Sequence, residues 1–220
     1  MNRCAVIFDV DGVLVDSYRA HFESWRQMFA EQNAGFTEDE FRATFGRTSR
    51  DIIAGLYGEL SEEEILRWDD RKEALYRDIL RQDFPVVDGA VDLVNALADA
   101  GFALAVGSSG PPANVALTLD CLPCGQRFTA RVTGADVTRG KPDPQVFLLA
   151  AERLGISPER CAVVEDAPAG VEAANRAGMA SIALTGTATR EELSHARLVV
   201  DSLRGLRPAA ISGLIGDAAS

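Results

Sequence analysis

The chain has no long apolar run. None of its hydrophobic stretches approaches the ~20 residues that a membrane-spanning helix requires, so an integral membrane protein is excluded. The first apolar run meets Asp9 where a secretory signal peptide would need a small-residue cleavage site. We therefore expect a cytoplasmic protein that does not act at a membrane.

Positive charge is also in short supply. The sequence contains 22 Lys and Arg against 33 Asp and Glu, which gives a formal net charge of -11. An acidic balance of this size argues against nucleic acid or an anionic membrane surface as the main partner. It still permits a small anionic ligand, because a local cluster of cations can reverse the sign of the potential inside a cleft.

Cysteine is scarce, and only four thiols occur in the chain. Cys121 and Cys124 form a single CxxC without a second pair or a nearby His, a pattern that disfavours a zinc site. Cys4 and Cys161 lie in or beside apolar runs, where a free Cys is usually a small core residue. We interpret all four as packing residues rather than as redox or metal-binding groups.

Short runs rich in apolar and β-branched residues alternate with helical patterns through most of the chain. The strand-like runs are 4–9, 102–108, 130–134, 161–166, 180–186 and 198–202. The helix-like segments are 89–100, 112–120, 144–154, 168–177 and 189–195. This alternation predicts an α/β fold in which a parallel sheet carries helices on both faces. In such sheets, ligands bind at the carboxyl ends of the strands, at a topological switch point.

No convincing strand occurs between Tyr18 and Gln82, where the pattern is helical throughout. The last of these helical segments begins with a capping box, Ser61 followed by Glu64. We therefore expect two domains: an α/β core, residues 1–16 and 84–220, and an inserted α-helical cap, residues 17–83. An insertion that follows a candidate site this closely can act as a lid.

Polar clusters are expected at the ends of four strands. Each cluster alone has an ordinary interpretation as turn or helix-cap chemistry. Together they supply what phosphoryl transfer needs: a nucleophile, a proton donor, hydroxyl and amide donors, a cation and oxygen ligands for Mg²⁺. The clusters are Asp9, Asp11 and Gly12; Ser108 and Ser109; Lys141; and Glu165 and Asp166.

In order and separation these clusters resemble the four motifs of the haloacid dehalogenase (HAD) superfamily, and the resemblance covers nearly the whole chain. The helical insertion is similar in position to the cap of the subfamily that includes phosphoglycolate phosphatase and β-phosphoglucomutase. The resemblance implies a Rossmann-like core, a small-molecule phosphomonoester as substrate, and Mg²⁺ as cofactor. The motifs read Asp9-x-Asp11-Gly12, Ser108, Lys141-Pro142 and Glu165-Asp166.

The resemblance also implies a role for each core residue. Asp9 is the nucleophile that forms an aspartyl-phosphate, and Asp11 is the general acid and then the general base. Dehalogenases of this superfamily lack the second Asp, so Asp11 implies phosphate chemistry. Gly12 lets the backbone approach closely. The implied phosphate ligands are Ser108, the Ser109 amide and Lys141, and the implied metal ligands are Asp9, the Asp11 carbonyl, Asp166 and Glu165.

The insertion holds further candidates. His21 resembles a cap residue that positions the acid/base Asp, but it also shares a helix face with Trp25, four residues on; both interpretations stay open. The stretch "FGRTSRDII" resembles the substrate-specificity loop of the cap. Its candidates for contact with the leaving group are Arg47, Thr48 and Arg50.

Two departures favour a hydrolase over a mutase. Ser49 stands where the mutase carries Arg, and Gly110, Pro111 and Pro112 replace polar residues that the mutase uses near its sugar. We therefore expect a Mg²⁺-dependent phosphatase acting on a sugar phosphate or a phosphoglycolate-like metabolite, with a β-phosphoglucomutase-type activity as the alternative. A non-catalytic phospho-accepting signalling protein is a third possibility, which the long insertion disfavours. No coiled-coil or extended-edge signal is present, so a monomer is the expectation.

Overall fold

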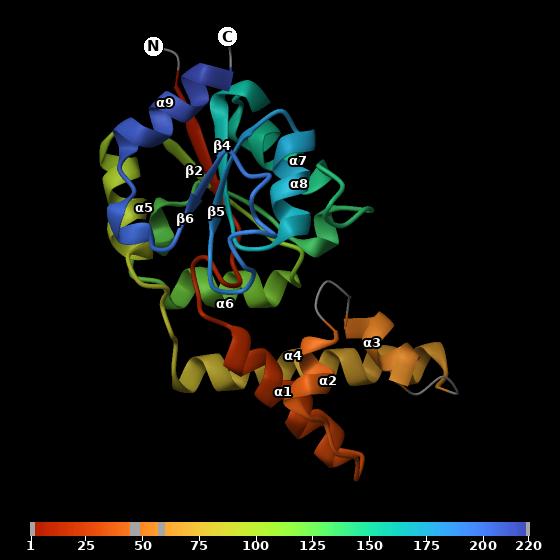
Figure 1. Ribbon diagram of the computed structural model, residues 1–220. Helices are drawn as coiled ribbons and strands as arrows, with labels where there is room; N and C mark the ends of the chain where they lie inside the picture. Colours follow the sequence, from red (N-terminus) through yellow and green to blue (C-terminus); the bar gives the residue numbers. More distant parts are fainter. Residues whose placement is uncertain (1–2, 45–48, 57–59, 219–220) are drawn as a thin grey trace. The chain divides into compact units, whose positions relative to one another are not determined.

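The computed structural model describes residues 3–44, 49–56 and 60–218. The chain divides into two compact units, one formed by Met1–Asp16 with Val86–Ser220 and the other by Ser17–Pro85. The first unit is built around a sheet and the second is helical (Figure 1). The second junction lies two residues beyond the one expected from the sequence, at Pro85 rather than at residue 83.

The first unit contains a six-stranded sheet in the order β3-β2-β1-β4-β5-β6. Every neighbouring pair of these strands is parallel. The α/β fold with a parallel sheet is therefore confirmed. The strands are β1 (Ala5–Phe8), β2 (Ala103–Gly107), β3 (Ala130–Val132), β4 (Cys161–Glu165), β5 (Ala180–Leu184) and β6 (Leu198–Val200).

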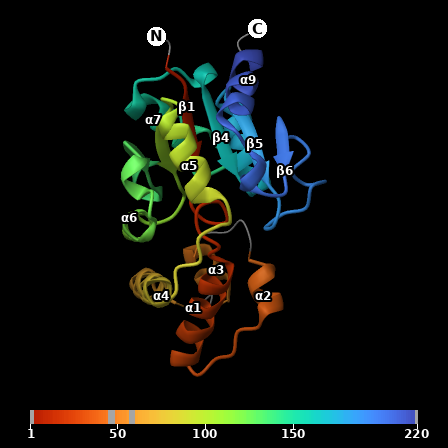
Figure 2. The same cartoon turned by 90° about the vertical axis from the view of Figure 1, so that its left-hand side faces the viewer.

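Helices cover both faces of the sheet (Figures 1 and 2). On one face lie α7 (Gln145–Leu154) and α8 (Pro168–Arg176), and on the other lie α5 (Ala90–Asp99) and α9 (Pro208–Ala218). The four residues of β1 and the five of β4 are all buried, which explains why these strands are continuously apolar until they reach their acidic ends. The remaining helix, α6 (Pro112–Cys121), follows β2. Short 3₁₀ turns lie at Gly125–Arg127, Gly134–Asp136, Pro158–Arg160 and Leu203–Gly205.

Two expectations from the sequence were wrong in detail, and one helix was not predicted. Residues 190–195 form turns rather than a helix, because Thr189 and Glu192 hydrogen-bond locally and so short a segment cannot offset the cost of helix nucleation. Helix α9 was not predicted, although Pro208 at its start and Ile211 and Ile215 four residues apart are signals for it. Cys121 is exposed rather than packed, because it lies at the end of α6.

The second unit consists of α1 (Tyr18–Glu31), α2 (Glu38–Arg42), α3 (Ser49–Leu56) and α4 (Glu62–Gln82) in its described residues. The capping box at Ser61 and Glu64 forms as predicted. Aromatic side chains make up much of this unit's own core, and Trp25 belongs to it rather than to a polar surface. Its fully or nearly buried members are Trp25, Met28, Phe29, Phe36, Phe41, Ile52, Ile53, Trp68 and Leu75.

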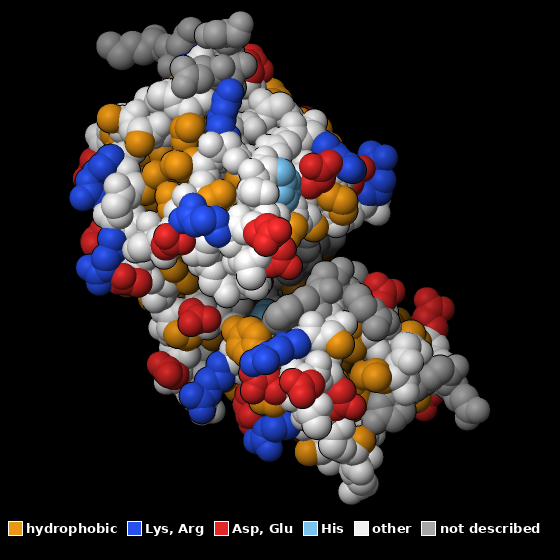
Figure 3. Space-filling view, in the orientation of Figure 1, with side chains coloured by type: hydrophobic (Ala, Val, Ile, Leu, Met, Phe, Trp, Pro, Cys, Tyr) orange, Lys and Arg blue, Asp and Glu red, His pale blue; other side chains and the backbone are white. Residues whose placement is uncertain are grey.

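The surface carries both signs of charge. On the face drawn in Figure 3, acidic and basic side chains are interspersed over both units rather than gathered by sign. Among the described residues, no helix combines the length and the hydropathy that a membrane span requires.

Candidate active site

The acidic motifs meet at the topological switch point of the sheet, where the strand order changes direction between β1 and β4. Strand β1 lies between β2 and β4, and its last residue, Phe8, is in register with Val106 and Val164. The next residue, Asp9, still donates its amide to the Val164 carbonyl at 2.9 Å. The polar residues that follow β1, β2 and β4 therefore emerge together at the carboxyl edge, where open α/β sheets bind ligands.

Lys141 joins two of these motifs. Its Nζ lies 2.5 Å from Oδ1 of Asp9 and 2.6 Å from Oε1 of Glu165. The same nitrogen lies 4.9 Å from the ring centroid of Phe147, at a distance that suits a cation–π contact. The sequence predicts Lys141 at the end of a strand. It lies instead in the loop that leads into α7.

Burial sets the protonation behaviour of this cluster. It raises the pKa of Asp9 to about 7, an effect that Lys141 opposes and that the Glu165 and Asp11 carboxylates reinforce. The pKa of Asp166 is raised well above its usual value, first by burial and then by Glu165 and Asp9. For Lys141, burial alone would lower the pKa, but the two bonded carboxylates outweigh it and raise the pKa. The arrangement thus holds more negative charge than one ammonium group can neutralise.

The carboxylates of Asp9, Glu165 and Asp166 fit a metal ion. One oxygen from each lies within 4.8 Å of the others, and all three residues are buried. With Lys141 protonated, three ionised carboxylates leave a formal charge of minus two, which a divalent cation would balance. Carboxylate oxygens are the donors that hard divalent cations prefer. The Asp11 side chain is not part of this group.

Glu165 is the most constrained of the three carboxylates. Its Oε2 accepts hydrogen bonds from the amides of Asp166 at 2.7 Å and of Ala167 at 2.8 Å, while Oε1 accepts from Lys141. A Cβ at Gly170 would stand 1.8 Å from Oε1, so only glycine leaves room for this carboxylate. Glu165 is therefore fixed by the backbone at the start of α8 as well as by Lys141.

Gly12 serves Asp166 in a similar way. Its φ of 73° lies in the left-handed region, and a Cβ there would stand 1.9 Å from Oδ2 of Asp166. Gly12 was expected to permit a close approach to the backbone. The group that approaches it is the carboxylate of Asp166, which belongs to the candidate metal group.

The loop after β2 brings a hydroxyl near Asp11. Ser108 is buried, and its Oγ accepts the amide of Gly110 at 2.9 Å. A Cβ at Gly110 would stand 3.2 Å from that Oγ and 3.9 Å from Oδ2 of Asp11, so the hydroxyl and this carboxylate flank the same backbone position. Ser109, the next expected phosphate ligand, is exposed.

Thr187 was missed by the sequence analysis. It lies in the loop after β5, and its hydroxyl is hydrogen-bonded to Asp166, whose pKa this bond lowers against the stronger effect of burial. The same Oγ1 is 3.0 Å from the position that a Gly12 Cβ would occupy. The available signal was a polar residue just beyond the fifth strand, at the same edge of the sheet. It belongs to none of the four motifs, so the sequence pattern does not mark it as a site residue.

Thr187→Val is expected to weaken metal binding by about tenfold, because hydrogen bonds to the ligands of a metal orient them. We would measure Mn²⁺ binding by electron paramagnetic resonance without substrate. Thr187→Ser keeps the hydroxyl and should bind like the wild type. Thr185→Val removes a similar Thr–Asp bond, to Asp201 at 2.9 Å, and serves as the matched control. Unchanged Mn²⁺ affinity in Thr187→Val would contradict the assignment.

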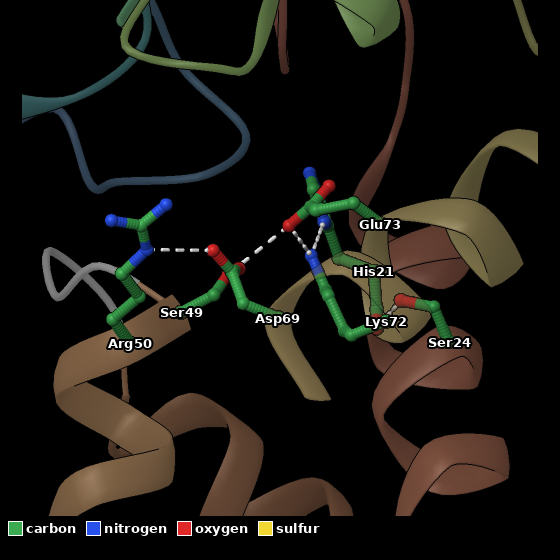
Figure 4. A network of polar contacts seen from close by, with 7 residues as sticks. All are labelled: His21, Ser24, Ser49, Arg50, Asp69, Lys72 and Glu73. Carbon is green, nitrogen blue, oxygen red and sulfur yellow. Dashed lines mark hydrogen bonds and ion pairs between the residues drawn. The ribbon is translucent and has the colours of Figure 1, made fainter. Parts of the chain in front are cut away.

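His21, expected as a cap residue of the site, belongs to a polar network within the helical unit (Figure 4). Its Nδ1 lies 2.9 Å from Nζ of Lys72, and its ring stacks on Tyr76 with 4.1 Å between centroids. Because an ammonium group can only donate, Nδ1 is the acceptor and the ring proton is on Nε2. His21 therefore presents a defined tautomer, while Trp25 is packed in the core of the unit.

Of the three residues expected in the specificity loop, only Arg50 lies in the described part of the chain. Its Nε is bonded to Oδ2 of Asp69 at 2.9 Å. Arg47 and Thr48 lie outside the described residues. The partners Asp69, Lys72 and Glu73 on α4 were not predicted, because charged residues on a long helix ordinarily indicate a solvated face.

Comparison with known protein families agrees with the site residues described above. A sequence model of the haloacid dehalogenase-like hydrolases matches residues 5–178, which include the residues at the ends of β1, β2 and β4 and Lys141. The chain belongs to this hydrolase family, and the family resemblance drawn from the four motifs is confirmed.

The relatives of the chain include named phosphatases and a phosphoglucomutase. The chain is 34% identical to the phosphorylated carbohydrates phosphatase of Thermotoga maritima, over 81% of this chain and 83% of that protein. It is 33% identical to hexitol phosphatase A of Escherichia coli, over 91% and 92% of the two chains. A solved β-phosphoglucomutase from Clostridium difficile is 25% identical, with a TM-score of 0.85 and 98% of each chain covered. Relatives named as phosphatases are phosphoric monoester hydrolases, the enzyme class expected from the motifs.

Proposed function

We propose that this protein is a Mg²⁺-dependent phosphatase that hydrolyses a small phosphorylated metabolite, in first place a sugar or polyol phosphate, through an aspartyl-phosphate at Asp9. The observation that carries the proposal is the position of Lys141, bonded to both Asp9 and Glu165 beside a third buried carboxylate, Asp166. The names of two relatives, a phosphorylated carbohydrates phosphatase and a hexitol phosphatase, support the substrate class.

The reaction divides into two displacements at phosphorus. A carboxylate oxygen of Asp9 attacks, the bond between phosphorus and the leaving oxygen breaks, and Asp11 gives its proton to that oxygen. Asp11 then takes a proton from a water molecule, which attacks the phosphorus and breaks its bond to Asp9. Phosphate leaves, and both carboxyl groups return to their starting states.

The groups around Asp9 bind the phosphoryl oxygens. The Ser108 hydroxyl, the Ser109 amide and the Lys141 ammonium donate to them and stabilise the charge that develops during transfer. Asp9, Asp166, the Asp11 carbonyl and Glu165 would hold the Mg²⁺. When bound, the ion neutralises the repulsion between the Asp9 carboxylate and the anionic substrate.

The helical unit supplies residues for the part of the substrate beyond the phosphate. We assign this role to His21 and Arg50, together with Arg47 and Thr48. The Lys72 partner of His21 fixes which ring nitrogen carries the proton, and that leaves Nε2–H as a hydrogen-bond donor.

A phosphosugar mutase is the second candidate. It is favoured by the likeness to a solved β-phosphoglucomutase over 98% of each chain. A mutase must hold a bisphosphate intermediate and re-orient it in the site, so it needs a cation that can bind a second phosphate group.

The test is phosphate release in the presence of Mg²⁺ from a panel of esters: phosphoglycolate, hexose 6-phosphates, a hexitol 6-phosphate, β-glucose 1-phosphate and nucleoside monophosphates. Efficient release from one or a few carbohydrate esters is the expected result, and release should stop when EDTA is added. Conversion of β-glucose 1-phosphate to the 6-phosphate after priming with a bisphosphate, without net phosphate release, would establish the mutase instead.

A further inference from the structure

The loop that carries Lys141 lies at the surface of the sheet unit. Residues 138–140 and Pro142 are exposed, whereas the side chain of Lys141 turns inward to the Asp9 and Glu165 carboxylates. Surface loops are more mobile than the helices and strands they connect. A lysine side chain is itself a flexible four-carbon stem. The position of the ammonium group therefore depends on what fixes the backbone of this loop.

The side chain of Gln145, the first residue of α7, closes the loop. Its Oε1 accepts hydrogen bonds from the amide of Thr138 at 3.0 Å, from the hydroxyl of Thr138 at 3.2 Å and from the amide of Arg139 at 3.0 Å. The donors precede Lys141 and the acceptor follows it, so the contact spans the lysine from both sides. Two of the three donors are backbone amides, and the contact thus fixes the main chain itself.

Asp143 closes the same loop less firmly. Its Oδ1 accepts the amide of Gln145 at 3.0 Å, and its Oδ2 lies 3.1 Å from Nε of Arg139. The Arg139 side chain is 73% exposed, and ion pairs at such positions contribute little. The three hydrogen bonds to Gln145 are therefore the stronger constraint on the segment before Lys141.

Helix α7 provides the rigid support for this contact. Val146, Phe147, Ala150 and Ala151 belong to the buried core of the sheet unit. The ring of Phe147 also faces Nζ of Lys141, at 4.9 Å from its centroid. Gln145 therefore ties the exposed loop to a helix that is held by the core and that already contacts the ammonium group.

We propose that Gln145 is a positioning residue for the reaction, which acts through Lys141. The proposal rests on the proposed phosphatase function and deepens it. Gln145 holds the backbone before Lys141 against α7, so that the ammonium group stands where it binds the phosphoryl oxygens. A misplacement of about 1 Å at such a group can reduce a rate by on the order of 10²-fold.

The first test uses Gln145→Leu, which removes the acceptor and nearly keeps the volume. We expect kcat/KM for p-nitrophenyl phosphate to fall by about tenfold or more, because Lys141 is less well placed. Amide hydrogen exchange of the Thr138–Arg139 segment, measured by mass spectrometry, should become faster. Gln145→Glu keeps an acceptor and should retain most of the activity and the slow exchange. Gln126→Leu, the same substitution at an exposed position, should change neither.

The second test asks whether Gln145 acts through Lys141. The probe is tungstate, an oxyanion similar to phosphate, and its binding is measured by calorimetry in Mg²⁺. Gln145→Leu should weaken tungstate binding by about tenfold while Lys141 is present. It should cause no further loss in the Lys141→Met background, because the residue through which it acts is gone. An equal loss in both backgrounds would overturn the proposal.

The outcomes separate this inference from the phosphatase itself. If the wild type hydrolyses p-nitrophenyl phosphate and Gln145→Leu does so equally well, only the role of Gln145 fails. If the wild type releases phosphate from no ester, both proposals fail. Should Gln145→Leu not fold, Gln145→Asn decides: its acceptor is one methylene group too short to span the loop, and activity equal to that of the wild type contradicts the proposal.

Discussion

Replacing Asp9 by asparagine is expected to reduce Mg²⁺-dependent phosphate release by about 10³-fold or more, because an amide cannot form the covalent intermediate. Asparagine has nearly the same size, so the position beside Lys141 should stay filled. Activity is measured with p-nitrophenyl phosphate and with the best ester of the panel. Asp16→Asn, an exposed position in the same part of the chain, is the matched control and should retain full activity. Full turnover by Asp9→Asn would contradict the mechanism.

The same substitution should stabilise the metal-free protein above neutral pH. The pKa of Asp9 is raised from 3.8 to about 7 by burial first, against Lys141. Between these two values the folded state binds more protons than the unfolded state, so the free energy of unfolding falls as pH rises through this window. Below 3.8 the group makes no difference, and above about 7 the loss is complete.

Asparagine does not ionise, so the variant should lack this fall in stability. The gain over the wild type is on the order of a few kcal/mol and is largest above pH 7. Urea denaturation in EDTA at pH 5 and pH 8 measures it. A gain that is the same at both pH values, or that is larger at pH 5, would show that Asp9 is not the group that titrates. If the carboxylates of the site repel one another in the folded protein, removing one charge should give a variant that is inactive but more stable than the wild type.

The core motifs could be predicted from the sequence because each consists of residue types that the surrounding pattern does not favour. Asp9 and Asp11 follow a buried strand directly, and Glu165 and Asp166 stand at the end of another. Since the carboxyl ends of parallel strands share one edge of the sheet, their proximity follows from the fold alone. Lys141 was expected at the end of a strand, but it lies in the loop before α7, where an irregular backbone does not determine from the sequence where the side chain points.

The partners of these residues could not be predicted in the same way. Thr187 contacts Asp166 from the loop after the neighbouring strand β5, which has no motif of its own. Within the helical unit, Glu73, the partner of Lys72, looks like any other acidic residue on a helix rich in charge. Periodicity gives the face on which a side chain lies, but not whether a neighbouring helix buries it. Contacts of this kind depend on tertiary packing, which a single sequence does not encode in any local pattern.

Lys141→Met is expected to have the largest effect on stability. Methionine fills the space against Phe147, but it leaves Asp9, Glu165 and Asp166 buried without their cation. Removing one partner of a buried ion pair typically costs about 3–5 kcal/mol, because the remaining charge stays desolvated. We expect a loss of this size in EDTA at pH 8, measured by urea denaturation, together with loss of phosphatase activity.

Two conditions should reduce the loss, and each follows from the charge count. At pH 5.5 the raised pKa of Asp9 leaves that group protonated, so one of the three negative charges is absent and the variant should lose less stability. Millimolar Mg²⁺ should also recover part of the loss, since an ion that binds only the folded state stabilises it. Arg139→Met, which breaks an exposed pair with Asp143 in the same loop, should change stability by less than about 1 kcal/mol. If Lys141→Met were no less stable than Arg139→Met in EDTA at pH 8, the carboxylates would not need this cation, and the charge balance on which the metal site and the mechanism rest would be wrong.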